Sequence, residues 1–117
     1  MAEDEPLAAE VLQEALTEEG FAVLAAPDGQ AALDMAEAGA GFDLLLTDLR
    51  MPRLDGQELI RRLRARRPNL PVVVMTGFPP PGGPDSLHDG PGPLRLMTKP
   101  IHIAGLVATL RAVMRGD

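Results

Sequence analysis

The alternation of amphipathic segments and short apolar runs along the chain predicts an α/β fold. Apolar residues recur at helical spacing over four segments, roughly 6–19, 30–38, 57–67 and 103–113. Runs rich in strand-forming residues lie between them, at 21–26, 44–48, 72–76 and 94–98. The runs at 44–48 and 72–76 do not alternate with polar residues, which is typical of strands covered on both faces. We therefore expect one domain, residues 1–117, with a parallel sheet between two helix layers.

Two segments interrupt this order. Residues 78–93 contain six prolines and four glycines, and proline removes a backbone donor and clashes inside a helix. We therefore expect an irregular loop there and no complete helix. At the other end of the chain, only Met1 and Ala2 precede the acidic group Glu3-Asp4-Glu5, and the first predicted helix begins at residue 6. The sequence leaves no room for a full strand before that helix.

Composition and charge exclude several classes of site. The chain has no cysteine and two histidines, which removes disulfides, thiolate catalysis and cysteine-based metal sites. A net charge of -6 argues against direct nucleic-acid binding. Seven of the eleven basic residues fall within 50–67, on a predicted helix, and we interpret this run as a solvated helix face. No apolar run approaches the length of a membrane span and no leader is evident, so we expect a cytoplasmic protein without membrane insertion.

Polar residues follow three of the predicted strands. Asp48, Thr76 and Lys99, the only lysine in the chain, each come at or just after the end of an apolar run. The carboxyl ends of parallel strands meet at one edge of a sheet, which is where ligands of such sheets bind. Glu3 and Asp4 belong at the same edge if the chain enters the sheet there. A cluster of carboxylates offers the oxygen ligands that Mg²⁺ takes together with waters and a phosphate.

These residues carry a family resemblance. The segment DLRMPRLDG, Asp48 to Gly56, resembles the phosphorylation loop of response-regulator receivers. Segments 3–6, 75–77 and 98–100 resemble the other three signatures of that family, in the same order along the chain. The resemblance extends over nearly the whole chain. It implies a flavodoxin-like, doubly wound parallel sheet, and it also implies a cis peptide bond between Lys99 and Pro100.

The resemblance further implies a role for each residue. Asp48 would be the phosphoacceptor, taking a phosphoryl group from a sensor histidine kinase or a phosphotransfer protein. Glu3, Asp4, Asp48 and the backbone carbonyl of Arg50 would hold Mg²⁺, with Glu3 acting through water. Lys99 and Thr76 would contact the phosphoryl group. The chain would then be a switch and not an enzyme, apart from its own phosphotransfer and autodephosphorylation.

The chain departs from the family in three places. The family's first strand, central in the sheet, is missing, and an incomplete sheet exposes backbone groups that predict a homodimer. The loop at 78–93 replaces the fourth helix, and Leu96 stands where many members carry a switching aromatic residue. The missing strand and the absent fourth helix favour an alternative function, a pseudo-receiver that binds partners without being phosphorylated. An independent hydrolase is less favoured, because we find no second pair of nucleophile and base.

Overall fold

The computed structural model describes residues 1–2, 6–23, 25–39, 41–49, 54–77 and 92–115. In chain order, its elements are α1 (Pro6–Glu18), α2 (Gly29–Glu37), β1 (Leu45–Asp48), α3 (Gly56–Arg66), β2 (Val72–Thr76), β3 (Leu94–Thr98) and α4 (Ile103–Met114). The three strands form a parallel sheet in the order β1-β2-β3. The α/β class, the parallel sheet and the two helix layers are confirmed.

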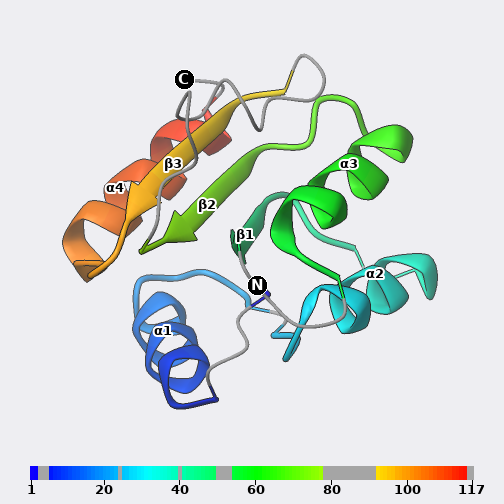
Figure 1. The fold of residues 1–117 in the computed structure, drawn as a ribbon. Coiled ribbons are helices and arrows are strands. Elements are labelled where there is room, and N and C mark those ends of the chain that lie inside the picture. The colour runs from blue at the N-terminus through cyan, green and yellow to red at the C-terminus, as the bar shows by residue number, and fades with distance from the viewer. Residues whose placement is uncertain (3–5, 24, 40, 50–53, 78–91, 116–117) are drawn as a thin grey trace.

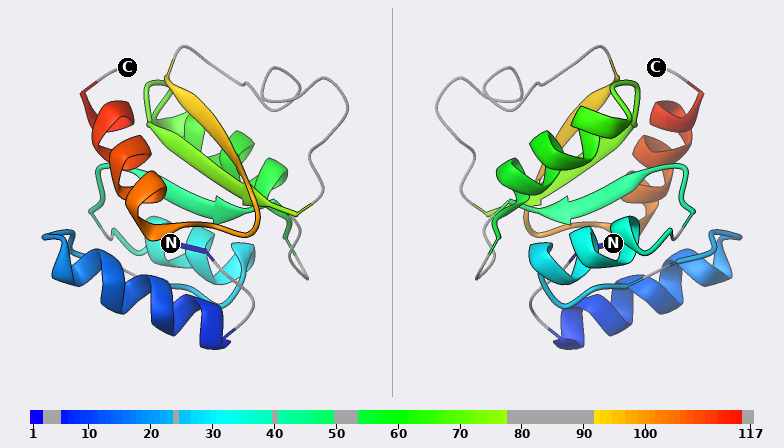
Figure 2. Two further views of the ribbon diagram at one scale, coloured as in Figure 1. Left: turned by 90° about the vertical axis from the view of Figure 1, so that its left-hand side faces the viewer. Right: turned by 90° about the vertical axis from the view of Figure 1, so that its right-hand side faces the viewer.

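The helices cover both faces of the sheet (Figure 1). Helices α2 and α3 lie on one face, and α1 and α4 lie on the other, as the two side views also show (Figure 2). Successive residues of β2 divide between the two layers: Val72 and Val74 pack with the first pair of helices, Val73 and Met75 with the second. All four are fully buried. A strand enclosed on both sides needs apolar residues at every position, which is why this run lacks alternation.

Aspartates begin the two helices of one layer. Asp28 caps α2 by accepting a hydrogen bond from the Ala31 N–H at 2.8 Å, and Asp55 caps α3 through the Glu58 N–H at 2.9 Å. An aspartate at this position satisfies a backbone donor that the helix itself leaves unpaired. Each aspartate therefore marks the start of its helix.

The predicted strand at 21–26 is wrong. Within its described residues only Ala26 pairs as a strand, in an isolated parallel bridge to Ala2. Ala2 also bridges Thr47, so residues 1–2 lie between these two segments, in the position of a central strand. In the described part of the chain, Ala2 pairs at that position only through these isolated bridges. Residues 21–23 have no strand partner among the described residues, and a strand is defined by such pairing.

The interpretation of the basic run needs one correction. Arg61, Arg62 and Arg66 are exposed, as expected, but Arg64 is only 3% exposed. Its guanidinium donates to the carbonyl of Leu70 at 2.8 Å and to that of Pro93 at 2.9 Å. Arg64 therefore satisfies carbonyls at the starts of β2 and β3 and is not part of the solvated helix face.

Several predictions fall on residues outside the described ranges. These are the positions of Glu3, Asp4 and Arg50, and the irregular character of residues 78–91. Among the helices of the described residues, none has the length and apolar character to cross a bilayer.

Candidate functional site

The sheet brings the predicted site residues to one edge. Asp48 is the last residue of β1 and pairs in register with Met75 of β2, so Thr76 lies one residue further along the neighbouring strand. Thr76 in turn pairs with Thr98, the residue before Lys99. Parallel pairing thus collects the three polar residues at the carboxyl ends of adjacent strands, as predicted.

The Asp48 carboxylate is buried beside a lysine. Its side chain is 4% exposed, and the Nζ atom of Lys99 lies 2.8 Å from its Oδ1 atom. The separation makes this an ion pair, although its angles do not qualify as a hydrogen bond. Among the described residues no donor makes a hydrogen bond to either carboxylate oxygen. A carboxylate has about four acceptor sites and is costly to bury without donors, so this group retains its capacity to bind something else.

Backbone contacts position Asp48 and Lys99. The N–H of Lys99 donates to the carbonyl of Thr76 at 2.7 Å, which joins the ends of β2 and β3. The peptide bond from Lys99 to Pro100 is cis, as predicted. On the other side of the site, the N–H of Asp48 donates to the carbonyl of Ala2 at 2.9 Å. The lysine that follows β3 therefore reaches across β2 to the carboxylate at the end of β1.

Gly56 packs against the backbone of the site, a role that the sequence did not indicate. Gly56 begins α3, and a Cβ atom built on it would lie 2.1 Å from the carbonyl oxygen of Asp48 and 2.9 Å from the Cα atom of Leu49. Its N–H donates to the carbonyl of Leu49 at 2.8 Å. The first turn of α3 therefore packs directly against the backbone of the phosphoacceptor candidate. The only sequence signal for Gly56 was its place at the end of the segment that resembles the phosphorylation loop.

Thr47 is a second residue that the sequence did not single out. It is fully buried, and its hydroxyl donates to the carbonyl of Asp48 at 2.8 Å. The carbonyl that Gly56 approaches is therefore also held by a hydrogen bond from the preceding side chain. Both contacts restrain the backbone carbonyl of Asp48.

Comparisons with known proteins agree with this geometry. The family model described as "Response regulator receiver domain" matches residues 1–111. The chain is a member of the response-regulator receiver family. It is 34% identical over 115 residues to the response regulator receiver protein CpdR of Brucella abortus, covering 97% of this chain and 93% of CpdR. It is 37% identical over 118 residues to the uncharacterized transcriptional regulatory protein YkoG of Bacillus subtilis, covering 97% of this chain and 49% of YkoG.

Solved structures show the same fold. A receiver protein from Sinorhizobium medicae superposes with a TM-score of 0.86 at 28% identity, covering 97% of this chain and 90% of the other. The receiver domain of the hybrid histidine kinase CckA gives a TM-score of 0.80 at 32% identity, with 97% and 94% covered. The chain spans about half the length of several curated relatives, YkoG among them, and nearly all of CpdR. The receiver family and its fold are therefore established for this chain.

The receiver family implies Mg²⁺, and Asp48 fits that ion. Its two oxygens are buried and accept no hydrogen bond from the described residues, and an anionic oxygen is the donor that Mg²⁺ prefers. The described residues contain no cluster of three or more side chains that could hold a metal. The other predicted ligands, Glu3, Asp4 and the Arg50 carbonyl, lie outside the described residues. Asp48 is thus the one predicted ligand whose surroundings are described.

Proposed function

We propose that this receiver accepts a phosphoryl group on Asp48 within a two-component phosphorelay. The observation that carries the proposal is the buried Asp48 carboxylate, with its two oxygens unoccupied by described hydrogen-bond donors and the Lys99 ammonium 2.8 Å away. A carboxylate kept only for stability would be expected to have its oxygens satisfied. A site that leaves the group reactive instead suits a nucleophile.

In the reaction, a carboxylate oxygen of Asp48 attacks the phosphorus of a phosphohistidine. A P–O bond forms as the P–N bond breaks, and the electron pair leaves on the imidazole nitrogen, which takes up a proton. The product on the receiver is an acyl phosphate. Hydrolysis later returns the carboxylate and releases inorganic phosphate, so the chain resets itself without acting as an enzyme on other substrates.

Two side chains of the site have separate tasks in this proposal. The Lys99 ammonium lies beside Oδ1 before transfer, and as a point charge on a flexible chain it follows the phosphoryl oxygens afterwards. Thr76 is 4% exposed at the adjoining strand end, and its hydroxyl donates to a phosphoryl oxygen. Movement of these two groups toward the new charge is the switching event, which changes the contacts the receiver makes with partners.

Mg²⁺ would be held by Asp48 together with Asp4 and the Arg50 carbonyl, with Glu3 acting through water, and it would neutralise charge on the carboxylate and phosphoryl oxygens.

The phosphodonor is a sensor histidine kinase or a phosphotransfer protein. In support, α1 exposes Leu7 and Val11, at 78% and 60%, one helical turn apart. Apolar residues at this spacing form a stripe suited to packing against a partner helix.

One observation favours a different function. Only Ala2 bridges the segments on either side of the missing first strand, and the acidic pair follows it directly. Metal ligands need support from rigid elements, whereas Ala2 pairs with its described neighbours through isolated bridges. A pseudo-receiver that binds partners without phosphorylation would tolerate this. The two functions differ in whether Asp48 is chemically reactive.

Phosphorylation kinetics distinguish them. We would incubate the chain with phosphoramidate, a small donor with a P–N bond, and follow intact mass over time. One reaction contains Mg²⁺ and a parallel reaction contains a chelator in its place. An adduct that forms with Mg²⁺ and is absent with the chelator supports the phosphoacceptor function. Asp43→Asn is the matched control, because Asp43 is exposed and precedes β1, away from the carboxyl ends of the strands. This variant should react like the parent. A chain that stays unmodified under both conditions would leave the pseudo-receiver as the function.

A further inference from the structure

The start of α2 packs directly against the segment that leads into α3. Gly29, the first residue of α2, is buried, and a Cβ atom built on it would lie 2.1 Å from the carbonyl oxygen of Leu54 and 3.0 Å from its carbonyl carbon. Both are backbone atoms, so neither can turn aside as the end of a flexible side chain can. Glycine therefore allows α2 to begin closer to Leu54 than any other residue would.

Leu54 connects this contact to the phosphoacceptor candidate. It comes two residues before Gly56, and a Cβ atom on Gly56 would lie 2.1 Å from the Asp48 carbonyl oxygen. Asp55 lies between the two and caps α3 through the Glu58 N–H. Two close backbone contacts therefore follow one another, first α2 against Leu54 and then α3 against Asp48, with a single residue of the chain between them.

Leu54 has little room to move away from Gly29. It is 7% exposed and belongs to the buried core that Leu33 of α2 and Leu59 of α3 also form. A closely packed core transmits a displacement, because it has few voids that could absorb one. A shift in the first turn of α2 therefore reaches the start of α3.

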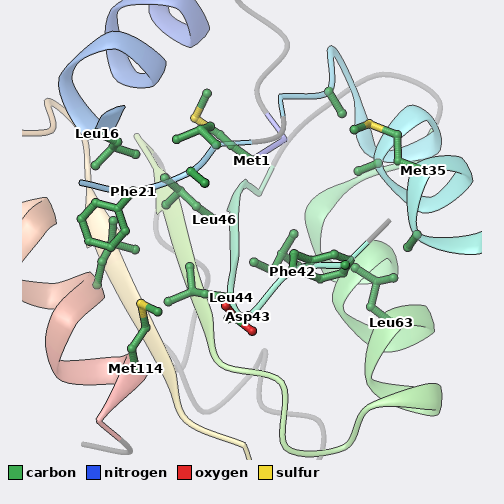
Figure 3. Close-up of a pocket in the computed structure, with 18 of the residues that line it drawn as sticks. Met1, Leu16, Phe21, Met35, Phe42, Asp43, Leu44, Leu46, Leu63 and Met114 are labelled. Carbon is green, nitrogen blue, oxygen red and sulfur yellow. The ribbon is translucent and has the colours of Figure 1, made fainter. Parts of the chain in front are cut away.

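The two helices pack less closely toward their other ends. There, Met35 of α2 and Leu63 of α3 line an apolar cavity of about 360 Å³ (Figure 3). At the starts of the same helices, neither Gly29 nor Gly56 has space for a single Cβ atom. The tightest contacts of α2 and α3 with the rest of the chain therefore lie at the edge of the sheet that carries Asp48.

We propose that Gly29 is a positioning residue for Asp48, which it holds in place through Leu54 and the first turn of α3. The inference rests on the proposed phosphoacceptor function, because the position of Asp48 matters most if its carboxylate reacts. In Gly29→Ala, Leu54 or α2 would have to retreat by at least about 1 Å, since non-bonded heavy atoms prefer about 3.5 Å. A displacement of about 1 Å at a reacting group can slow a reaction by about 100-fold.

Phosphoramidate labelling of the whole chain with Mg²⁺ tests the proposal. Gly29→Ala should slow labelling by at least about 10-fold while the chain remains folded in the assay. Gly41→Ala is the matched substitution, because Gly41 is exposed and its Cβ would meet no described residue within 4 Å, and it should label like the parent. Ala36→Gly weakens α2 without adding an atom, since glycine is a poor helix former. This variant should unfold at lower urea concentration and label at the parent rate.

The cap of α2 provides a milder perturbation, which also serves if Gly29→Ala does not fold. Asp28 accepts a hydrogen bond from the Ala31 N–H, so Asp28→Ala frees the first turn of α2 and withdraws its support from Leu54. Labelling should slow by several-fold. Asparagine caps a helix as well as aspartate does, so Asp28→Asn should restore the parent rate. Slow labelling in both variants, or in neither, would contradict a positioning role for the start of α2.

The backbone amide of Asp48 reports on the position of this residue without any phosphodonor. In nitrogen–proton correlation spectra, Gly29→Ala should shift the amide signals of Asp48 and Gly56, whereas Ala36→Gly should leave both close to their parent positions. If the parent itself takes no phosphoryl group, the proposed function fails, and the amide shift still decides whether Gly29 positions Asp48. An Asp48 amide signal that does not move in Gly29→Ala, or labelling of that variant at the rate of a reactive parent, would overturn the proposal.

Discussion

Replacing Gly56 by alanine should displace the backbone of Asp48 without changing any of the side chains proposed to react or to contact the phosphoryl group. The new Cβ would lie 2.1 Å from the Asp48 carbonyl oxygen, 2.9 Å from the Leu49 Cα atom and 3.0 Å from the Asp48 carbonyl carbon. Non-bonded heavy atoms prefer about 3.5 Å, so the backbone of Asp48 or the start of α3 must move by roughly 1 Å. Thr47 holds the same carbonyl through its hydroxyl, which limits how far it can yield.

The expected cost follows from that geometry. Overpacking a tight site typically costs about 1–3 kcal/mol, and alanine at the first position of a helix recovers little of it. We therefore expect Gly56→Ala to lower the free energy of unfolding by about 1–3 kcal/mol. A displacement of this size at the nucleophile should also slow phosphorylation, by up to about 100-fold.

Urea unfolding and the rate of phosphoramidate labelling measure the two effects. Gly105→Ala is the matched control, because its Cβ would lie no closer than 3.9 Å to another residue, at the Met97 Cε atom, inside α4. That variant should be neutral or more stable by up to about 1 kcal/mol, with an unchanged labelling rate. If Gly56→Ala unfolds at the same urea concentration as the parent and reacts as fast, the close packing of α3 against Asp48 does not position the nucleophile.

Three further predictions concern charged groups. Lys99→Gln should cost about 1 kcal/mol, less than a fully buried pair because the lysine side chain is 37% exposed, and a double-mutant cycle with Asp48→Asn in urea should recover that energy as coupling; additive effects would show that the pair does not interact. Arg64→Met should cost about 1–3 kcal/mol by leaving the Leu70 carbonyl without a described donor, while the Pro93 carbonyl keeps the Val72 N–H, whereas the exposed Arg66→Met should cost under about 0.5 kcal/mol; equal losses would contradict the assigned contacts. Burial lowers the pKa of the Met1 α-amino group from 8.0 to about 6, so the folded state binds fewer protons between these values. The free energy of unfolding of the 117-residue chain should therefore rise by about 2 kcal/mol from pH 6 to pH 8, and an acetylated amino terminus should abolish this dependence.

The sequence predicted the strands that have a neighbouring strand to pair with. The bounds of β2 and β3 agree with prediction, because each is an apolar run with a polar residue at its end and a neighbouring strand to pair with. Segment 21–26 has equally suitable residues, but among its described residues Ala26 alone pairs, with Ala2. Strand formation depends on the partner as much as on the segment itself, and local sequence does not show which partner the fold provides.

The sequence also predicted part of the site, again because of how the strands pair. Asp48, Thr76 and Lys99 could be placed together because parallel strands align their carboxyl ends. The burial of Arg64 could not be predicted, because it depends on carbonyls of Leu70 and Pro93 that the fold brings near. The close approach of Gly56 to Asp48 could not be predicted either, because it arises from the packing of α3 against β1 and not from local sequence.

The central claim is that Asp48 is the residue that forms the acyl phosphate, and locating the adduct tests it most directly. The labelled chain would be reduced with borohydride, which converts a phosphorylated aspartate into homoserine, and then digested and sequenced by tandem mass spectrometry. We expect the intact chain to gain about 80 Da, and after reduction the residue at position 48 alone to be lighter by about 14 Da, because the acyl phosphate is the group reduced. Asp48→Asn should show neither change. A mass loss at Asp43 or Asp55, or an adduct that persists in Asp48→Asn, would contradict the account.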